Sequence, residues 1–553
     1  MKRLLSLLVA CAVAPALFAQ NPPPCTTQGG LGVVNANDLS ASLYSNGRFL
    51  DGLGLKSIDP NTQYGARLWL AGIDPGGNLK LTTPTYSNIG LHSGPLTLTG
   101  AQADDCLRWN RVFAVKGPDV IRFLDTLPNL TPQLLIDRFP SIAGWPAVGN
   151  PYYESVYGYP LPATASALAP FYDADSDGLY DPMQGDYPVV RLKNKPLFVP
   201  EEIHWMVYND VDVLLGVRAE YQLTTWAFKC PNVSPLNRTI FTSHKVYYKN
   251  VERLDSVFTA LWTDFDIGCY ADDFIGSLPE RNSFFAYNQD PVDGPGSGCN
   301  VLSTFPDSVP VPAQSTTFLG SKMDHMGYAI NNSAFYPPAM GDPISPVEFY
   351  NVINGRWRDG TPLTVGGAGY NPGNPGAPTA FAFPGDPNNP AAWTMCSASI
   401  AGGDIRGLGI RALGSLAPGQ IVETTAAWTY HTQTNLPCNL GSMISEIDAV
   451  IAAYNNGFTN ACAPLVVGTK DIAAPAHFDV FPNPANNVFT VRHNETIPVS
   501  VRVWDPLGRL VYFNADLPAG QFDVQTAQWA PGLYRLQLQT ADGYGVKNVV
   551  IAR

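Results

Sequence analysis

The sequence predicts a mainly β protein, with a large β-rich region of the sandwich type followed by a small antiparallel β-sandwich. Apolar residues alternate with polar ones over many short segments, as they do in half-buried strands. Gly and Pro contribute 50 residues each to the 553, which indicates many turns. Aromatic residues make up 11% of the chain and provide material for a large core.

The first residues have the pattern of a secretory signal peptide, which we place at residues 1–19. Lys2 and Arg3 precede an apolar run, and small residues near Ala19 provide a cleavage site. The run is too short to span a membrane, and no later stretch reaches the roughly 18 apolar residues that a spanning helix needs. The mature chain is therefore expected to begin at Gln20.

Charge and cysteine content narrow the class of protein. The net charge of −13 and the absence of any basic run argue against nucleic-acid binding, which needs a basic patch. Eight cysteines remain after residue 19, and an oxidising compartment favours disulfides. We expect the pairs Cys269–Cys299 and Cys438–Cys462, because each closes a short loop. No CxxC motif is present, which disfavours a zinc cluster.

Elements and boundaries follow from local patterns. Strands are expected at 65–74, as two segments within 244–268, and as two segments within 409–431 that the turn "LAPGQ" joins. Helices are expected within 440–457 and, more weakly, at 119–127. The cargo region is placed at 20–465, with a division into two domains near residue 200 as an alternative. A linker at 466–476 precedes a C-terminal domain at 477–553.

The C-terminal domain shows strict alternation. Val499, Val501 and Val503 face one way, and Tyr534 begins a second alternating run in "LYRLQLQ". Several such strands within about 75 residues predict an immunoglobulin-like antiparallel β-sandwich.

The segments "FDVFPNPANNVFTV", "VWDPLGRLV" and "WAPGLYRLQLQTADGYGVKNVVIAR" resemble the type A C-terminal sorting domain of the type IX secretion system of Bacteroidota. The matching positions are Pro482, Asn483, Pro484, Asp505, Gly508, Arg509, Gly532, Tyr534 and Lys547. The resemblance implies that the outer-membrane translocon recognises this domain and that a sortase removes it. The cargo would then be released or attached to surface lipopolysaccharide. The cargo region, with "ARLWLAGIDPGGNL" and "DADSDGLYDPMQGDYP", is similar to exported proteins of the same phylum that have no assigned activity.

The segment "YDADSDGLYDPMQGDYP" places four aspartates within nine residues, with no Lys or Arg among them. Two carboxylates about 5 Å apart repel by roughly 3 kcal/mol at an effective dielectric constant near 20. A cation relieves this repulsion, and the spacing matches a calcium loop with its glycine at position 6. The expected ligands are Asp173, Asp175, Asp177, the carbonyl of Leu179, Asp181 and Asp186. Position 12 is Gln184 instead of Glu, and a solvated acidic turn is the alternative.

A second, weaker cation site is expected in "DFDIGCYADDF", at Asp264, Asp266, Asp272 and Asp273. Its aspartates lack regular spacing, so an exposed acidic loop is the alternative. Both sites would be structural, with calcium as the cofactor.

Two functions remain open on the sequence. The first is a non-enzymatic, calcium-stabilised protein of the outer cell surface that acts in adhesion, surface structure or glycan binding. The second is a secreted polysaccharide hydrolase that uses Glu202, Asp210 or Asp212 as acid and base, near His204 and Tyr208. No HExxH or GxSxG motif supports other hydrolytic chemistry.

Overall fold

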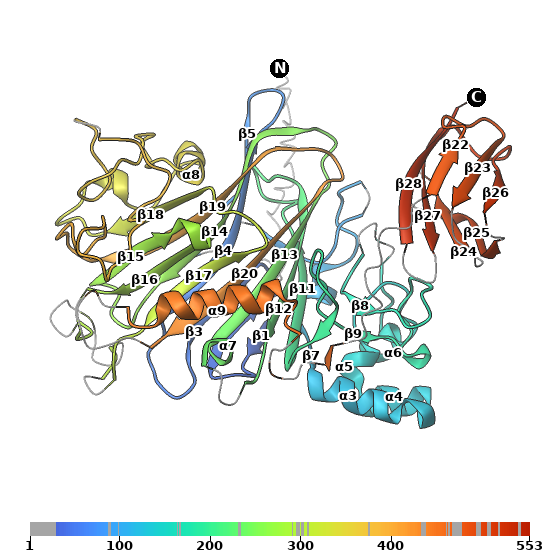
Figure 1. Cartoon of the computed structure of the whole chain (residues 1–553), viewed down its shortest axis with the longest axis horizontal. Helices are drawn as coiled ribbons and strands as arrows, with labels where there is room; N and C mark the ends of the chain where they lie inside the picture. The colour runs from blue at the N-terminus through green and yellow to red at the C-terminus, as the bar shows by residue number, and fades with distance from the viewer. Residues whose placement is uncertain are drawn as a thin grey trace, which may run out of the picture.

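The computed structural model shows two large antiparallel sheets that form one β-rich region, followed by a separate small sandwich at the C-terminus (Figure 1). It describes residues 29–552, except for residues 87–89, 98, 163, 165–166, 231–233, 290, 295–298, 300–303, 307–308, 374–375, 433–437, 439, 460–461, 463–464, 467–477, 494–498, 506–509, 518–519 and 540–543. The expected signal peptide and most of the expected linker lie outside these residues. No helix in the described part is both long and apolar enough to cross a membrane.

The first sheet has eight strands in the order β1-β2-β3-β4-β14-β19-β18, with β5 also paired to β4. Their bounds are β1 Leu31–Val34, β2 Leu39–Tyr44, β3 Arg48–Leu55, β4 Gln63–Ile73, β5 Leu79–Thr82, β14 Leu254–Phe265, β18 His325–Asn331 and β19 Asp404–Leu416.

The second sheet has nine strands in the order β15-β16-β17-β20-β13-β12-β11-β6, with β7 also paired to β11. Their bounds are β6 His92–Ser93, β7 Phe113–Lys116, β11 Glu202–Asn209, β12 Ala219–Ala227, β13 Thr239–Tyr248, β15 Asp273–Leu278, β16 Ser283–Asn288, β17 Ala313–Leu319 and β20 Ile421–His431. Strands from both sides of residue 200 share this sheet, so the cargo region does not divide there.

Strands that follow one another in the sequence often belong to different sheets. The strands expected within 244–268 are β13 and β14, and those within 409–431 are β19 and β20. In each pair, the first and second strand lie in opposite sheets. The turns between these strands therefore carry the chain from one sheet to the other.

The main core lies between the two sheets. Phe49 of the first sheet contacts His244 and Trp428 of the second, with ring centroids 4.7 and 5.7 Å apart. β11 is buried on both faces, because Met206 belongs to this core and Trp205 belongs to a second core on the outer face. All eight residues of β11 are buried, although Glu202, His204 and Asn209 are polar.

Helices cover the outer faces. Those near β7 and β11 bury Val120, Phe123 and Leu135, while α8 packs Val352 and Ile353 against the first sheet. The expected helix α9 is present and contacts β17 and β20 (Figure 1). The helices are α2 Cys106–Trp109, α3 Gly117–Thr126, α4 Pro132–Arg138, α5 Pro140–Ala143, α6 Tyr153–Tyr157, α7 Ser234–Asn237, α8 Pro346–Ile353 and α9 Met443–Asn455.

One of the two expected disulfides is confirmed and the other is wrong. Cys269 pairs with Cys299, whereas Cys438 pairs with Cys396 and Cys462 pairs with Cys230. The 13 residues of α9 separate Cys438 from Cys462. A helix of that length spans about 20 Å, so the segment between the two cysteines is not a short flexible loop.

The C-terminal domain is a sandwich of a three-stranded and a four-stranded sheet, with orders β22-β23-β26 and β25-β24-β27-β28. The expected alternation is confirmed, since Val499, Val501, Val503 and Tyr534 are all at most 3% exposed and share one core. The strands are β22 Phe478–Phe481, β23 Val488–His493, β24 Val499–Trp504, β25 Leu510–Leu517, β26 Gln521–Gln525, β27 Gly532–Gln539 and β28 Tyr544–Ile551. The short pairs β8 Phe171–Tyr172 with β9 Tyr187–Pro188 and β10 Phe198–Val199 with β21 Leu465–Val466 complete the set.

Candidate cation site and polar pocket

The acidic loop at residues 173–186 is closed at its base by β8 and β9. Tyr172 and Tyr187 are paired across these strands, and their rings stack 4.9 Å apart. Above this base, oxygen atoms of Asp173, Asp175 and Asp177 all lie within 4.8 Å of one another. The structure therefore brings together the three carboxylates at calcium-loop positions 1, 3 and 5.

Backbone N–H groups hold the loop in shape. Gly178 N donates to Asp173 Oδ2 at 2.9 Å, and Leu179 N donates to Asp177 Oδ1 at 2.7 Å. Gly178 has a φ of +80°, which glycine adopts without strain, so the glycine at position 6 makes the sharp turn that was expected. Burial raises the pKa of Asp173, so the carboxylate charge is unfavourable at that position without a partner.

Asp181 and Asp186 have a different role from the other three. Asp186 is fully buried and accepts hydrogen bonds from Ala174 N at 2.8 Å and Asp181 N at 2.9 Å. Asp181 Oδ1 accepts from Met183 N at 2.9 Å. Both side chains thus fix the backbone around the loop. Burial raises the pKa of Asp186 to about 6, and the charges of Asp173 and Asp175 add to the shift.

No Lys or Arg within the described ranges forms an ion pair with Asp173, Asp175 or Asp177. Arg502 of the C-terminal domain reaches the loop, but its Nη2 donates to the backbone carbonyl of Ser176 at 2.5 Å. Among the described residues, no protein cation is therefore bound to these three carboxylates to offset their mutual repulsion.

The second group of carboxylates is assembled from distant parts of the chain. Oxygen atoms of Asp264, Asp266 and Asp404 lie within 4.8 Å of one another. Arg406 is the cross-strand partner of Asp264 in the β14–β19 pair, and it lies 2.9 Å from Asp264 and 2.6 Å from Asp404. The segment "DIRG" at residues 404–407 is expected from the sequence to make a structural ion pair, and the structure shows one between Asp404 and Arg406. Their position beside Asp264 could not be predicted, because only the strand register brings them there.

Burial controls the electrostatics of this group. It raises the pKa of Asp264 to about 8, against the opposing effect of Arg406. It also raises the pKa of Asp266 to about 7. Asp272 and Asp273, expected in the same site, lie elsewhere: Asp272 groups with Asp293 and Cys269, and Asp273 Oδ2 accepts from Ile267 N at 3.1 Å.

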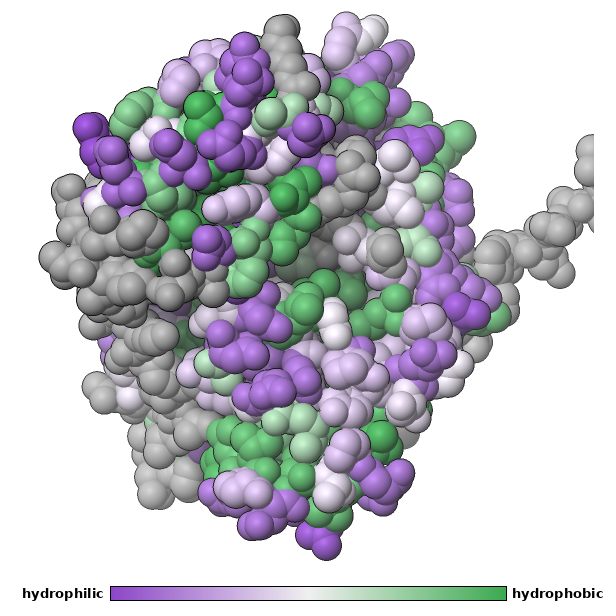
Figure 2. All heavy atoms as spheres, turned by 90° about the vertical axis from the view of Figure 1, so that its right-hand side faces the viewer, coloured by the Kyte–Doolittle hydropathy of each residue, from purple (hydrophilic) through white to green (hydrophobic). Residues whose placement is uncertain are grey.

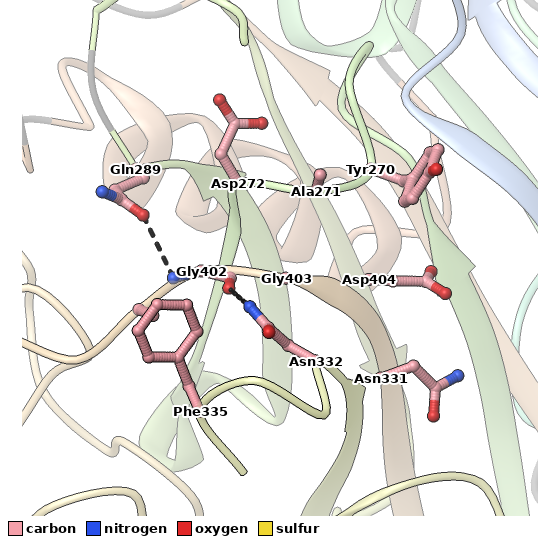
Figure 3. Close-up of a pocket in the computed structure, with 11 residues that line it drawn as sticks. Tyr270, Ala271, Asp272, Gln289, Asn331, Asn332, Phe335, Gly402, Gly403 and Asp404 are labelled. Carbon is pink, nitrogen blue, oxygen red and sulfur yellow. Dashed lines mark hydrogen bonds between the residues drawn. The ribbon is translucent and has the colours of Figure 1, made fainter. Parts of the chain in front are cut away.

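A polar pocket of about 500 Å³ adjoins this group through Asp404 (Figure 3). Its lining comes from the segments that follow β14, β16 and β18 and from the start of β19. Its lining comprises Tyr270, Ala271, Asp272, Gln289, Asn331, Asn332, Phe335, Ala401, Gly402, Gly403 and Asp404. The volume is within the 300–1,000 Å³ that is typical of ligand sites.

The residues proposed for hydrolase chemistry do not form an open site. Glu202 is 4% exposed and accepts from the backbone N–H of Asn35 and Ala36 at 2.6 and 2.7 Å. Asp210 is fully buried and accepts from Ala219 N at 2.6 Å. Both carboxylates fix the fold and are out of reach of a polysaccharide, so the structure does not support them as an acid–base pair.

The other members of that motif are also engaged in structural contacts. His204 and Tyr208 are 4% and 2% exposed, within β11. Asp212 is exposed and lies 2.7 Å from His92 Nε2. None of these side chains is in the lining of the polar pocket.

A serine, histidine and glutamate constellation also went unnoticed in the sequence. Ser315 Oγ lies 2.8 Å from His431 Nε2, and His431 Nδ1 lies 2.7 Å from Glu446 Oε2. This geometry is that of a hydrolytic triad. Ser315 and His431 are nevertheless 0% exposed beneath α9, so the group attaches this helix to the sheet instead of meeting a substrate.

The sorting-domain positions lie on the C-terminal sandwich. Asn483, which follows β22, is bonded to β28: its Nδ2 donates to Asn548 O and its Oδ1 accepts from Val550 N, both at 2.8 Å. Tyr534 OH donates to Ala530 O at 2.8 Å, and Lys547 Nζ lies 3.3 Å from Asp479. Pro482 and Pro484 flank Asn483, Asp505 follows β24, and Gly532 begins β27. Gly508 and Arg509 lie outside the described residues.

The comparison with family models confirms the C-terminal resemblance. Residues 479–552 match the family described as the secretion system C-terminal sorting domain. No curated protein matches the sequence.

Solved structures give only distant likenesses. An immunoglobulin-like β-sandwich protein of the DUF3244 family from Bacteroides vulgatus is 18% identical, with 14% of this chain and 99% of that one covered and a TM-score of 0.12. A polysaccharide lyase is 9% identical, with 66% of this chain but only 37% of that one covered and a TM-score of 0.18. The adhesin domain of Epf from Streptococcus pyogenes is 6% identical, with coverages of 60% and 91% and a TM-score of 0.12.

These TM-scores are too low to transfer any activity to this chain, so its assignment depends on the sorting domain. That domain interacts with the type IX secretion machinery and directs its cargo out of the cell. The chain is therefore a cargo protein of the type IX secretion system, with its sorting domain at residues 479–552 and its destination at the cell surface or beyond.

Proposed function

We propose that this cargo is a calcium-stabilised, non-enzymatic protein of the outer cell surface that acts in adhesion, surface structure or glycan binding. The observation that carries the proposal is the gathering of Asp173, Asp175 and Asp177 on a loop whose backbone is already fixed. Calcium prefers oxygen ligands in a flexible geometry, and a loop with this spacing provides them.

The proposed ligands of the first calcium are the three clustered carboxylates and the carbonyl of Leu179. Asp181 and Asp186 complete the loop by holding its backbone. Bound calcium would relieve the mutual repulsion and fix the segment next to β8 and β9.

A second cation at Asp264, Asp266 and Asp404 belongs to the same proposal. The demand for a cation is smaller here, because Arg406 already neutralises part of the charge. The expected order of affinity is therefore the acidic loop first and this group second.

The surface on the face drawn in Figure 2 is compatible with exposure to water outside the cell. Figure 2 shows that apolar side chains on the face drawn there form small patches between hydrophilic ones. The proposed outer partners are surface lipopolysaccharide, to which a sortase would attach the cargo, or an extracellular glycan.

Calorimetric titration of the calcium-free mature chain with Ca²⁺ tests the proposal. We expect binding with a dissociation constant of about 10⁻⁴ to 10⁻³ M, the range of extracellular modules. Asp175→Ala should abolish the tighter event, whereas the matched control Asp137→Ala, an exposed residue of α4, should leave it unchanged. Absence of calcium binding in the wild-type chain, or equal binding in Asp175→Ala, would contradict the proposal.

A further inference from the structure

The polar pocket has walls formed by two exposed aromatic rings. Tyr270 is 49% exposed and Phe335 is 68% exposed. The rings lie on opposite sides of the backbone from Gly402 to Asp404, on loops that follow β14 and β18 (Figure 3). Open ring faces beside a cavity are suited to an amphipathic ligand with flat C–H faces.

Side-chain amides reach the same segment from two directions. Gln289 Oε1 accepts from Gly402 N at 3.1 Å, and Asn332 Nδ2 donates to Gly402 O at 2.9 Å (Figure 3). Among the described residues, Gln289 Nε2 and Asn332 Oδ1 make no hydrogen bond. One free donor and one free acceptor match a hydroxyl group, which both donates and accepts.

The pocket is held open by backbone contacts. Gln289 N donates to Asp272 O at 2.9 Å, and Gly403 N donates to Asp273 O at 3.2 Å. A Cβ atom on Gly402 would lie only 2.7 Å from the carbonyl carbon of Asp272. The close approach of these segments therefore requires glycine at this position.

The charge around the pocket selects against anionic ligands. Asp272 and Asp404 are in its lining, whereas Asp264 and Asp266, which group with Asp404, are not. Arg406 is engaged by Asp264 and Asp404, and the pocket lining itself contains two carboxylates and no Lys or Arg. The local potential is therefore negative and repels uronate or sulfate groups.

We propose that the pocket between Tyr270 and Phe335 binds a neutral saccharide, with the rings stacked on the sugar and Gln289 and Asn332 bonded to its hydroxyl groups. This inference rests on the proposed function at the cell surface and adds the site and the ligand class. It does not require calcium at the acidic loop, which lies in a different part of the chain.

Titration of the chain from Gln20 to Arg553, with its sorting domain, against four neutral hexasaccharides tests the inference. The probes are cellohexaose, laminarihexaose, mannohexaose and N-acetylchitohexaose, with polygalacturonate as the anionic probe. We expect at least one neutral probe to bind and polygalacturonate not to bind. Tyr270→Ala and Phe335→Ala should each weaken binding about tenfold or more, through loss of ring contact.

The matched control is Phe513→Ala, which removes a ring that is 51% exposed on the sorting domain. It should leave the affinity unchanged, and melting temperatures confirm that each variant is folded. A neutral probe that binds all variants equally would overturn the pocket assignment and leave the proposed surface function intact. If no neutral probe binds while the chain still binds calcium, or if polygalacturonate binds best, the saccharide assignment is overturned.

Discussion

The loop at residues 173–186 gathers three carboxylates from five consecutive positions, whereas the group of Asp264, Asp266 and Asp404 combines two adjacent strands of a sheet. The first contains no basic residue within the loop, and the second has Arg406 directly across from Asp264. On the proposed function, the first region takes its counter-charge from solution, whereas Arg406 already neutralises part of the second. The difference teaches that the arrangement of counter-charges, more than the number of aspartates, decides where a cation is needed.

Arg406→Met should give the largest effect. The change leaves Asp264, which is 2% exposed, without its cationic partner. Removal of one member of a buried ion pair costs about 3–5 kcal/mol of unfolding free energy. Chemical denaturation of the mature chain measures this loss.

Arg253→Ala is the matched control for that experiment. Arg253 and Asp255 form an ion pair whose side chains are 62% and 61% exposed. Exposed pairs contribute about 0–1 kcal/mol, so this variant should unfold almost like the wild type. Equal losses in both variants would show that Arg406 does not neutralise a buried group, and the comparison would fail.

Asp186→Ala should have an intermediate effect in the presence of calcium. It leaves the N–H groups of Ala174 and Asp181 without acceptors, at a cost of about 2 kcal/mol. Calcium affinity should fall as well, because the loop loses its fixed shape. Unfolding and titration curves measure the two losses, and unchanged calcium affinity would show that Asp186 does not support the loop.

A buried histidine allows pH effects of the core to be separated from those of the acidic regions. His244 is fully buried, and burial lowers its pKa from 6.5 to about 3. Because the unfolded chain binds a proton at higher pH than the folded chain does, stability is lost as pH falls from 6.5 towards 3. The loss should reach about 2 kcal/mol at pH 5 and should be absent in His244→Leu.

Denaturation at pH 7 and pH 5 checks this prediction. The leucine can also change the stability of the variant at pH 7 through its packing. The measured quantity is therefore the difference in unfolding free energy between pH 7 and pH 5 for each protein. An equal change in wild type and variant would assign the acid sensitivity to other groups.

Local features of the molecule could be predicted from the sequence. The acidic loop, α9 and the alternating strands of the sorting domain each depend on spacings of a few residues, and the structure contains all of them. Asp404 and Arg406 could not be predicted as partners of Asp264, because they lie about 140 positions away and only the β14–β19 register aligns them. The polar pocket was missed for the same reason, since its lining comes from four separate segments.

The wrong cysteine pair shows where two sequence predictions conflicted. The helix was expected between Cys438 and Cys462, yet the two were paired because the loop between them is short. A helix is a stiff spacer of about 1.5 Å per residue, so the loop-closure argument did not apply to this segment.

The thermal melt of the mature chain in calcium and then in chelator tests the central claim most directly. At about a hundred times the dissociation constant, calcium should stabilise the folded chain by about 2.7 kcal/mol and raise the melting temperature by several degrees. The account predicts that Asp175→Ala loses this rise and that Asp137→Ala keeps it. An unchanged melting temperature in the wild-type chain would contradict the account and show that the acidic loop is a solvated turn.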